Sequence, residues 1–328
     1  MTDRLREYGG ARALVLGASG FIGRWVARTL SELGAVVTSA VRNPGAFDPV
    51  AAAWEIDGDV VGFDALDRDD IRQVIRTTRP DIVFNVVGYG VDRGETDAGA
   101  MERINRDLVR HMVEGLAGTK ATGGWAGRRL VHVGSALEYG LVQGVVREDT
   151  TPRPHTDYGR TKLAGTITLA EKAMSENLES VVARAFTVFG PGEHPGRLLP
   201  AIREAAATGS TVRLSAGTQR RDFGYVEDVA EGLLRLGLSS GAPGQVVNLA
   251  TGRLSSVREF AETAAHVLGL SPDRLEFGTE PVRADEMQIS GVEVARLRDL
   301  TGFSLPSDLD ALLRRATSFE TRLARISR

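Results

Sequence analysis

The segment that most restricts the fold is a glycine-rich turn near the start of the chain, Gly17-Ala-Ser-Gly20-Phe-Ile-Gly23. It directly follows the apolar run Ala13–Leu16, typical of a buried strand, and it opens a helical pattern from Phe21 to Leu33. Glycine permits a tight turn at the first position, lets the backbone approach a pyrophosphate at the second, and lets the helix pack closely on the sheet at the third. Because the first N–H groups of the helix would face the phosphates, this segment predicts a dinucleotide-binding site.

Apolar runs and helical patterns alternate over the first half of the chain, which indicates an α/β fold with helices on both faces of a parallel sheet. We expect a Rossmann-type doubly wound sheet with a smaller mixed α/β C-terminal lobe for the substrate. The first domain would take residues 1–185 and about 226–252, and the lobe residues 186–225 and 253–328. The predicted strands are 13–16, 36–41, 59–63, 82–87, 130–133, 181–186 and 245–249, and the predicted helices are 21–33, 69–78, 101–116, 158–175 and 256–268.

Composition excludes several classes of protein. The 328 residues contain no cysteine and only 5 histidines, so thiol chemistry is absent and a zinc site is not expected. A net charge of −3 does not suggest nucleic-acid binding. The first ten residues are polar, and no apolar run approaches the roughly 20 residues that span a bilayer. We therefore expect a cytoplasmic protein that binds neither nucleic acid nor membrane and holds no metal.

A Tyr-x-x-x-Lys pair, Tyr158 and Lys162, lies at helical spacing in the predicted helix 158–175. Residues four apart share one face of a helix, so the phenol and the ammonium would lie side by side. A phenol with a pKa of about 10 is a poor acid or base at neutral pH, and a neighbouring ammonium lowers that pKa. The pair therefore predicts proton transfer to or from a carbinol oxygen.

These patterns resemble the extended short-chain dehydrogenase/reductases, which include NAD-dependent nucleotide-sugar epimerases, dehydratases and ketoreductases. The resemblance is carried by the spacing G-x-x-G-x-x-G, the segment from Ser135 to Tyr139-Gly140, the pair Tyr158 and Lys162, and the run Arg221-Asp222-Phe223-Gly-Tyr225-Val226-Glu227-Asp228. It implies that Ser135, Tyr158 and Lys162 are catalytic. Tyr158 would protonate the substrate oxygen, Ser135 would orient it, and Lys162 would keep the Tyr158 pKa low and hold the nicotinamide ribose.

The resemblance also implies which residues bind the cofactor. The second predicted strand ends at Arg42 without an acid, which favours NADP(H), because a guanidinium pairs with a 2′-phosphate. NAD(H) is the alternative, with Arg42 a solvated loop residue. Asp64 would hold the adenine amino group or be a simple strand-end acid, and Asn105 would face the cofactor or be a surface amide. The cofactor-binding residues implied are Gly17, Ser19, Gly20, Phe21, Ile22, Gly23, Arg42, Asp64, Ala65, Val87, Gly88, Asn105, Tyr158, Lys162, Ala185 and Val188.

The implied partner is a nucleoside-diphosphate sugar. Arg221 and Arg283 would grip its diphosphate through bidentate hydrogen bonds, although Arg221 has an ion pair with Asp222 or a neighbour as its alternative. Thr187 stands where the family usually places an asparagine, which leaves its role open. The substrate-binding residues implied are Tyr89, Ser135, Ala136, Thr187, Leu199, Arg221 and Arg283.

One departure from the family pattern excludes one of the reactions that the resemblance implies. Sugar dehydratases carry an Asp-Glu pair after the catalytic hydroxyl residue, whereas Ala136 and Leu137 stand here and cannot move a proton. Glu138 comes one place late and is expected to be a surface acid. The leading hypothesis is an NADPH-dependent reductase of a nucleotide-linked 4-keto-6-deoxy sugar, and the alternative is a 4-epimerase with tightly bound NAD. A non-catalytic NADP-binding sensor would ordinarily lack the Tyr/Lys pair. A homodimer through the helices predicted at 101–116 and 158–175 is expected.

Overall fold

A computed structural model describes residues 3–91, 94–121, 124–282 and 286–326. Its centre is a seven-stranded sheet in which every pair of neighbouring strands is parallel. The Rossmann-type doubly wound fold predicted from the alternating pattern is confirmed. The strands, in spatial order, are β11 (Gln245–Leu249), β7 (Ser180–Ala185), β5 (Leu130–Ser135), β4 (Ile82–Asn85), β1 (Arg12–Leu16), β2 (Val36–Val41) and β3 (Asp59–Gly62).

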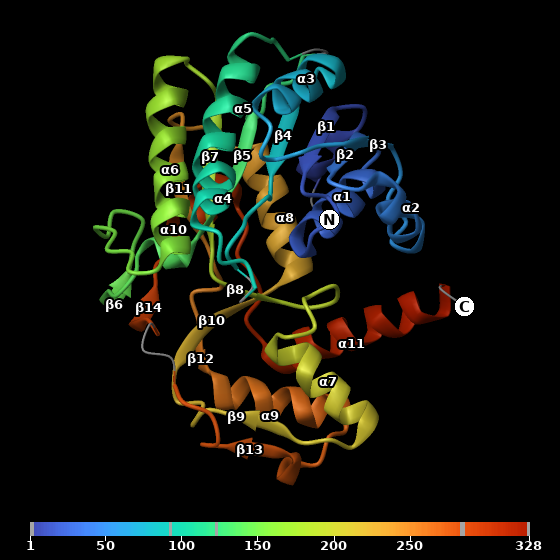
Figure 1. Cartoon of the computed structure of the whole chain (residues 1–328), viewed down its shortest axis with the longest axis vertical. Coiled ribbons are helices and arrows are strands. Elements are labelled where there is room, and N and C mark those ends of the chain that lie inside the picture. Colours follow the sequence, from blue (N-terminus) through green and yellow to red (C-terminus); the bar gives the residue numbers. More distant parts are fainter. Residues whose placement is uncertain (1–2, 92–93, 122–123, 283–285, 327–328) are drawn as a thin grey trace.

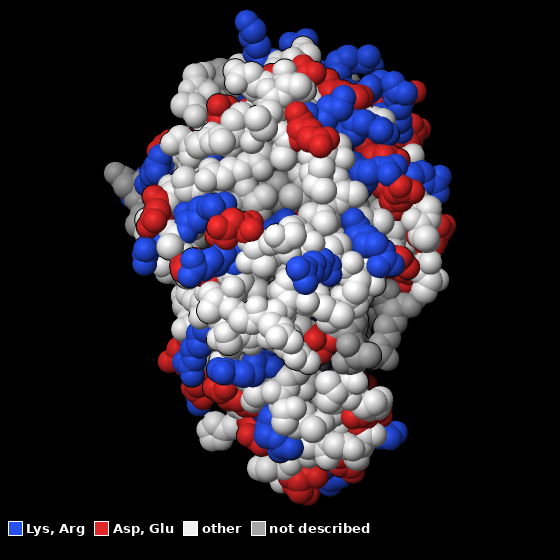
Figure 2. All heavy atoms as spheres, turned by 90° about the vertical axis from the view of Figure 1, so that its left-hand side faces the viewer, with Lys and Arg blue, Asp and Glu red and all other residues white. Residues whose placement is uncertain are grey.

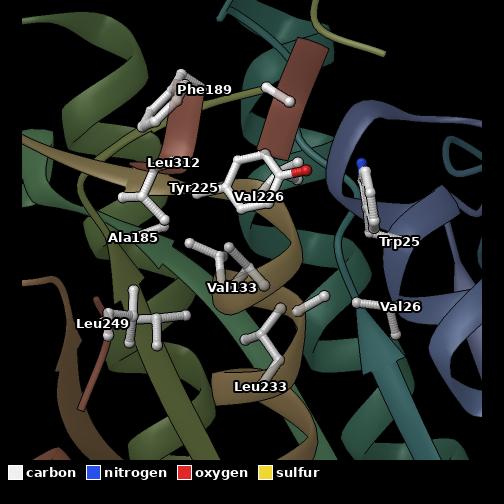
Figure 3. Packing of buried hydrophobic residues seen from close by; sticks show 14 of the residues in the cluster. Trp25, Val26, Val133, Ala185, Phe189, Tyr225, Val226, Leu233, Leu249 and Leu312 are labelled. Carbon is white, nitrogen blue, oxygen red and sulfur yellow. The ribbon is translucent and has the colours of Figure 1, made fainter. Parts of the chain in front are cut away.

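Helices cover both faces of this sheet (Figure 1). Along β1, Leu14 and Leu16 point into the core beneath one set of helices, whereas Ala13 and Val15 point into the core beneath the other. Figure 3 shows the second core, where Trp25 faces inward from α1 and Leu233 from α8. The first set comprises α3 (Arg68–Thr78), α5 (Leu108–Ala117) and α6 (Asp157–Ser175), and the second includes α1 (Phe21–Glu32) and α8 (Val226–Gly237).

The strand order reverses direction beside β1. From β1 the chain proceeds outward through β2 and β3, and then returns to the opposite side of β1 to form β4, β5, β7 and β11. In open α/β sheets, ligands bind in the crevice outside the carboxyl ends of the strands at such a reversal. We therefore expect a ligand-binding site at the carboxyl ends of β1 and β4.

The remaining elements lie mainly below the sheet in Figure 1. They form a three-stranded sheet in the order β12-β10-β8 and a two-stranded sheet β13-β9. A further parallel pair joins β6 to β14, so that residues close after β5 in sequence contact a segment near the C-terminus. The strands are β6 (Gln143–Val146), β8 (Thr187–Phe189), β9 (Val212–Leu214), β10 (Arg220–Tyr225), β12 (Leu254–Ser256), β13 (Leu275–Phe277) and β14 (Gln288–Val292), and the helices here are α7 (Leu198–Thr208), α9 (Val257–Leu268), α10 (Ala295–Thr301) and α11 (Leu309–Ile326).

In the first half of the chain, two helices differ from the prediction. The helix expected at 101–116 begins earlier, as α4 (Ala98–Glu102), and contains a π-helical turn, η2 (Arg103–Asp107), before α5. Helix α2 (Pro44–Ala53) was not predicted, because Pro49 inside it breaks the usual pattern. Short 3₁₀ turns occur at η1 (Asp3–Tyr8), η3 (Ala136–Glu138) and η4 (Pro272–Arg274).

The surface carries charges of both signs. On the face drawn in Figure 2, basic and acidic side chains alternate without a continuous basic stripe. Within the described residues, no helix has the length and apolar character needed to cross a membrane. Nor do those residues contain a group of three or more His, Asp or Glu side chains placed to hold a metal ion.

Candidate active site

The glycine turn closes tightly at the end of β1. Gly17 has a φ of +83°, which favours glycine, and its N–H donates to the Ala40 carbonyl at 3.0 Å. A methyl group on Gly23 would lie 2.1 Å from the Gly17 carbonyl oxygen, so only glycine fits where α1 leaves the turn. Gly20 caps α1 without a side-chain hydrogen bond, which leaves the first N–H groups of the helix for a ligand. These features fit the pyrophosphate of a dinucleotide.

The glycine turn and the tyrosine hydroxyl meet at the end of β4. A methyl group on Gly17 would lie 3.1 Å from the Val87 side chain, and one on Gly88 would lie 3.9 Å from the Tyr158 hydroxyl oxygen. Gly88 is exposed at this point. The structure therefore brings the Tyr158 hydroxyl to the carboxyl end of β4, beside the glycine turn, as the sequence predicted.

Helix α6 holds the Tyr/Lys pair. The Thr156 hydroxyl caps the helix by accepting from the Gly159 N–H at 3.0 Å, so Tyr158 lies in its first turn. One turn later Lys162 is only 2% exposed, and its Nζ donates to the Val133 carbonyl of β5 at 2.6 Å. Burial lowers the pKa of Lys162 to about 8, against an opposing effect of the Glu138 charge.

The pKa of Tyr158 differs from the sequence prediction. Burial, with smaller contributions from the charges of Glu138 and Glu95, raises it well above its usual value. A hydrogen bond with Ser135 and the charge of Arg197 act in the opposite direction but do not compensate. The net pKa is therefore raised, whereas the sequence predicted a lowered one, because desolvation of the phenol dominates. Tyr158 is a protonated phenol at neutral pH.

Ser135 ends β5 and opens a short capping box. Its hydroxyl accepts from the Leu137 N–H at 3.2 Å, while its own N–H donates to Glu138 Oε1 at 2.7 Å. The prediction that Glu138 is a surface acid is wrong, because the residue is 0% exposed. Its carboxylate is instead paired with Arg184, whose Nε donates to Oε2 at 2.8 Å.

Asn105 connects the loop after β4 to α6. Its Nδ2 donates to the Tyr89 carbonyl at 2.8 Å and to Thr161 Oγ1 at 3.0 Å, and its Oδ1 accepts from the Tyr89 N–H at 3.1 Å. The alternative of a surface amide is wrong, since Asn105 is fully buried. The π-helical turn brings its carbonyl against α6, where a methyl group on Gly165 would lie 2.1 Å from that oxygen.

The other residues expected at the cofactor lie around the same edge of the sheet. Arg42 is exposed at the end of β2 and forms no hydrogen bond or ion pair with the described part of the chain. Asp64 is exposed after β3, where its Oδ1 accepts from the Leu66 N–H. Ala185 ends β7, next to the end of β5. The rest are placed in the glycine turn and first turn of α1 (Ser19, Phe21, Ile22), directly after Asp64 (Ala65) and in β8 (Val188).

The residues expected at the substrate are brought together less completely. Arg221 forms a bidentate ion pair with Glu286, with Nε to Oε1 at 2.6 Å and Nη2 to Oε2 at 2.7 Å. Its partner is thus a neighbour in space, not Asp222, whose carboxylate accepts from the Thr251 and Gly252 N–H groups. The side chain of Leu199 belongs to the core, which leaves only its backbone for a ligand. Thr187 begins β8, Ala136 begins η3, Tyr89 follows β4, and Arg283 lies outside the described residues.

Four acidic or basic residues near the site were not predicted. Glu95 accepts from the Gly90 and Val91 N–H groups, and its charge reaches the Tyr158 hydroxyl, as does that of Arg197 at the start of α7. Glu138 binds the Ser135 N–H, and Glu286 is paired with Arg221 on β10. None lies in a local pattern that marks a site, and only their positions in the folded chain reveal them.

A doubly wound parallel sheet, with a glycine turn and a Tyr/Lys pair at its reversal point, defines an NAD(P)-dependent oxidoreductase of the extended short-chain type. The profile of the NAD-dependent epimerase/dehydratase family matches residues 13–250, and the chain belongs to that family. It is 29% identical over 307 residues to the dTDP-6-deoxy-L-talose 4-dehydrogenase (NAD(P)(+)) of Kitasatospora kifunensis, covering 90% of this chain and 91% of that one. It is 26% identical over 307 residues to the GDP-6-deoxy-D-mannose reductase of Pseudomonas aeruginosa, covering 89% and 91%.

A solved structure gives the same picture. MoeE5 in complex with UDP-glucuronic acid and NAD superposes with a TM-score of 0.79 and 27% sequence identity, covering 95% of this chain and 99% of that one. The likeness therefore extends over both the central sheet and the elements below it.

Proposed function

We propose that the protein is an NADPH-dependent reductase of a nucleoside-diphosphate-linked 4-keto-6-deoxy sugar. The observation that carries the proposal is the meeting of the Tyr158 hydroxyl, Gly88 and the glycine turn at the carboxyl end of β4. The names of two relatives, a 6-deoxytalose 4-dehydrogenase and a 6-deoxymannose reductase, support the class of substrate. The acids that sugar dehydratases use are replaced by Ala136 and Leu137, which supports reduction rather than water loss.

The residues present fit the cofactor. The glycine turn and the first N–H groups of α1 would hold its pyrophosphate, and Arg42 would pair with a 2′-phosphate. NADPH, when bound, supplies the hydride for the keto carbon. The absence of an acid at the end of β2 supports NADPH over NADH, although the family is described as NAD-dependent.

The chain's own groups would handle the proton and the geometry. Tyr158, protonated because burial raises its pKa, would donate its hydroxyl proton to the developing alkoxide. Ser135 would orient the same oxygen with its hydroxyl. Lys162, fixed by the Val133 carbonyl, would present its ammonium to the nicotinamide ribose and favour the phenolate that proton transfer leaves behind.

Two arginines would bind the diphosphate. Arg221 lies on β10 and would exchange the Glu286 carboxylate for phosphate oxygens of the substrate. Arg283 would form a second set of bidentate hydrogen bonds with the diphosphate. Two copies of the chain would pair through α5 and α6, as expected from the sequence. The exposed Ile167 and Met174 on α6, at 47% and 71%, support this surface as the contact.

The direct test mixes the purified protein with NADPH and a panel of nucleotide-linked 4-keto-6-deoxy sugars. Loss of the NADPH absorbance with at least one sugar is the expected result, and Tyr158→Phe should abolish it while NADPH still binds. No oxidation with any sugar would contradict the proposal.

The second candidate is a 4-epimerase that retains NAD, favoured by the NAD bound in the MoeE5 structure. Denaturing the purified protein and identifying the released nucleotide separates the two functions. Released NAD supports the epimerase, whereas an empty or NADP-bound site supports the reductase.

A further inference from the structure

The carboxylate of Glu138 is fully buried behind the catalytic turn. Its Oε1 accepts from the Ser135 N–H at 2.7 Å, and its Oε2 accepts from Thr166 Oγ1 on α6 and from Arg184 Nε on β7, both at 2.8 Å. The guanidinium of Arg184 also lies over the Tyr139 ring, 4.4 Å from its centroid. One carboxylate thus ties the catalytic turn to the elements on both sides of it.

The ammonium of Lys162 is held on β5, the strand that also carries Ser135. Its Nζ binds the Val133 carbonyl, two residues before the Ser135 N–H that binds Glu138. Between them, a methyl group on Gly134 would lie 2.6 Å from Glu138 Oε1, so the carboxylate needs a glycine there to approach the strand. Within the described residues Lys162 forms no ion pair, and Glu138 is the acid whose field acts on it.

We propose that Glu138 is a positioning residue of the active site, whose buried carboxylate fixes the Ser135 backbone and is the counter-charge that keeps the Lys162 ammonium protonated. The function of Ser135 and Lys162 in this statement rests on the proposed reductase or its epimerase alternative. The charge relationship between Glu138 and Lys162 rests on the anchoring of both side chains on β5, at the Ser135 N–H and the Val133 carbonyl, and does not depend on the proposed function.

The physical need for such a counter-charge follows from burial. A fully desolvated lysine loses its proton unless a negative charge opposes the loss, and burial lowers the Lys162 pKa to about 8 even with Glu138 present. The other titratable groups around it do not supply a negative charge. Buried His132 on β5 is neutral because its pKa is lowered, Tyr158 on the same helix is a neutral phenol, and Arg184 on β7 is a cation.

The chain offers a direct measurement, because it has only three lysines, Lys120, Lys162 and Lys172. Protein grown with carbon-13-labelled lysine gives three sets of side-chain NMR signals, which Lys120→Arg and Lys172→Arg variants would assign. Each signal titrates with pH and reports one ammonium. In Glu138→Gln we expect the Lys162 midpoint to fall by about two pH units, the size expected for removing one charge several ångström away at an effective dielectric constant of about 20.

Glu114→Gln is the matched control, since Glu114 lies 3.8 Å from the Lys172 ammonium. It should move only the Lys172 signal. An unchanged Lys162 midpoint in folded Glu138→Gln would overturn the proposal. If Glu138→Gln fails to fold, because it leaves Arg184 buried without its carboxylate partner, Glu138→Gln/Arg184→Met removes both charges. The double variant is expected to show a smaller fall in the Lys162 midpoint, because loss of the Arg184 cation offsets part of the loss of the carboxylate.

Enzyme assays provide the second readout. In Glu138→Gln, the alkaline limb of the plot of kcat against pH should shift to lower pH by the same number of pH units as the Lys162 midpoint. A merely structural effect would not shift it in this way. A limb that stays in place while the NMR midpoint moves would overturn the catalytic part of the proposal. If the wild-type protein reduces no sugar, the proposed function fails, while the NMR titration still decides the role of Glu138.

Discussion

Arg221 and Glu286 form a two-pronged ion pair at 2.6 and 2.7 Å, although 65 residues separate them in the chain. Arg221 is 31% exposed at its side chain, so a ligand can reach the guanidinium. A diphosphate that binds the Nε–Nη2 edge of Arg221 must displace the Glu286 carboxylate, which costs free energy.

Removing that competitor should strengthen nucleotide binding. In Glu286→Ala, we expect a nucleoside diphosphate to bind about three- to fivefold more tightly, since a partly exposed pair contributes at most about 1 kcal/mol. Titration calorimetry measures the change. Glu280→Ala, which removes an exposed partner of Arg213 in the same region, is the control and should have no effect. Weaker binding in Glu286→Ala would show that Arg221 does not contact the diphosphate.

Arg42 should determine the choice of cofactor. Arg42→Ala is expected to reduce the preference for NADPH over NADH by about ten- to a hundredfold, because a charge-assisted hydrogen bond contributes about 1.5–3 kcal/mol. The ratio of kcat/KM for the two cofactors measures it. Arg274→Ala, an exposed arginine in η4, should leave the ratio unchanged. An unaltered ratio in Arg42→Ala would place the 2′-phosphate elsewhere.

The buried ammonium of Lys162 is expected to lower the free energy of unfolding of the protein at neutral pH. Its pKa in the folded protein, about 8, lies below the ordinary 10.5, so the unfolded chain binds more protons between these values and this residue's contribution to stability rises with pH across that window. Lys162→Met removes the cost of the buried charge but leaves the Val133 carbonyl without its partner. We expect a net gain of about 1–2 kcal/mol in the free energy of unfolding at pH 7, with activity lost.

Urea denaturation at pH 7 and pH 10 checks this sign. The advantage of Lys162→Met over the wild type should shrink as the pH rises, because the lysine of the folded protein loses its proton above its pKa of about 8 and no longer buries a charge. An advantage that grows with pH would show that the buried ammonium is stabilising.

The contact between η2 and α6 should tolerate no methyl group. Gly165→Ala would place a carbon 2.1 Å from the Asn105 carbonyl oxygen and push α6 away from the π-helical turn. We expect a loss of about 1–3 kcal/mol in stability, with reduced turnover because Tyr158 and Lys162 move with the helix. Gly118→Ala, where the nearest atom is 3.8 Å away, should change neither the melting temperature nor the rate.

The sequence predicted the sheet well because its strands are continuous apolar runs separated by helical patterns. It also predicted that Tyr158 lies beside the glycine turn, because consecutive parallel strands end at one edge. It could not predict that Glu138 is buried, because the Arg184 that pairs with it follows 46 residues later and is aligned only by the pairing of β5 with β7. Likewise, nothing local to Asn105 shows that a π-helical turn presses it against Gly165.

The pairing of β6 with β14 joins two segments that are synthesised far apart in time. The segment 143–146 follows Ser135 closely, yet its partner strand comes from residues 288–292, and the outermost strand of the main sheet, β11, comes only at 245–249. A ribosome that has made the glycine turn, Ser135 and the Tyr/Lys helix has therefore not yet made β11 or β14. Strand β6 gains its parallel partner only after residues 288–292 have been synthesised.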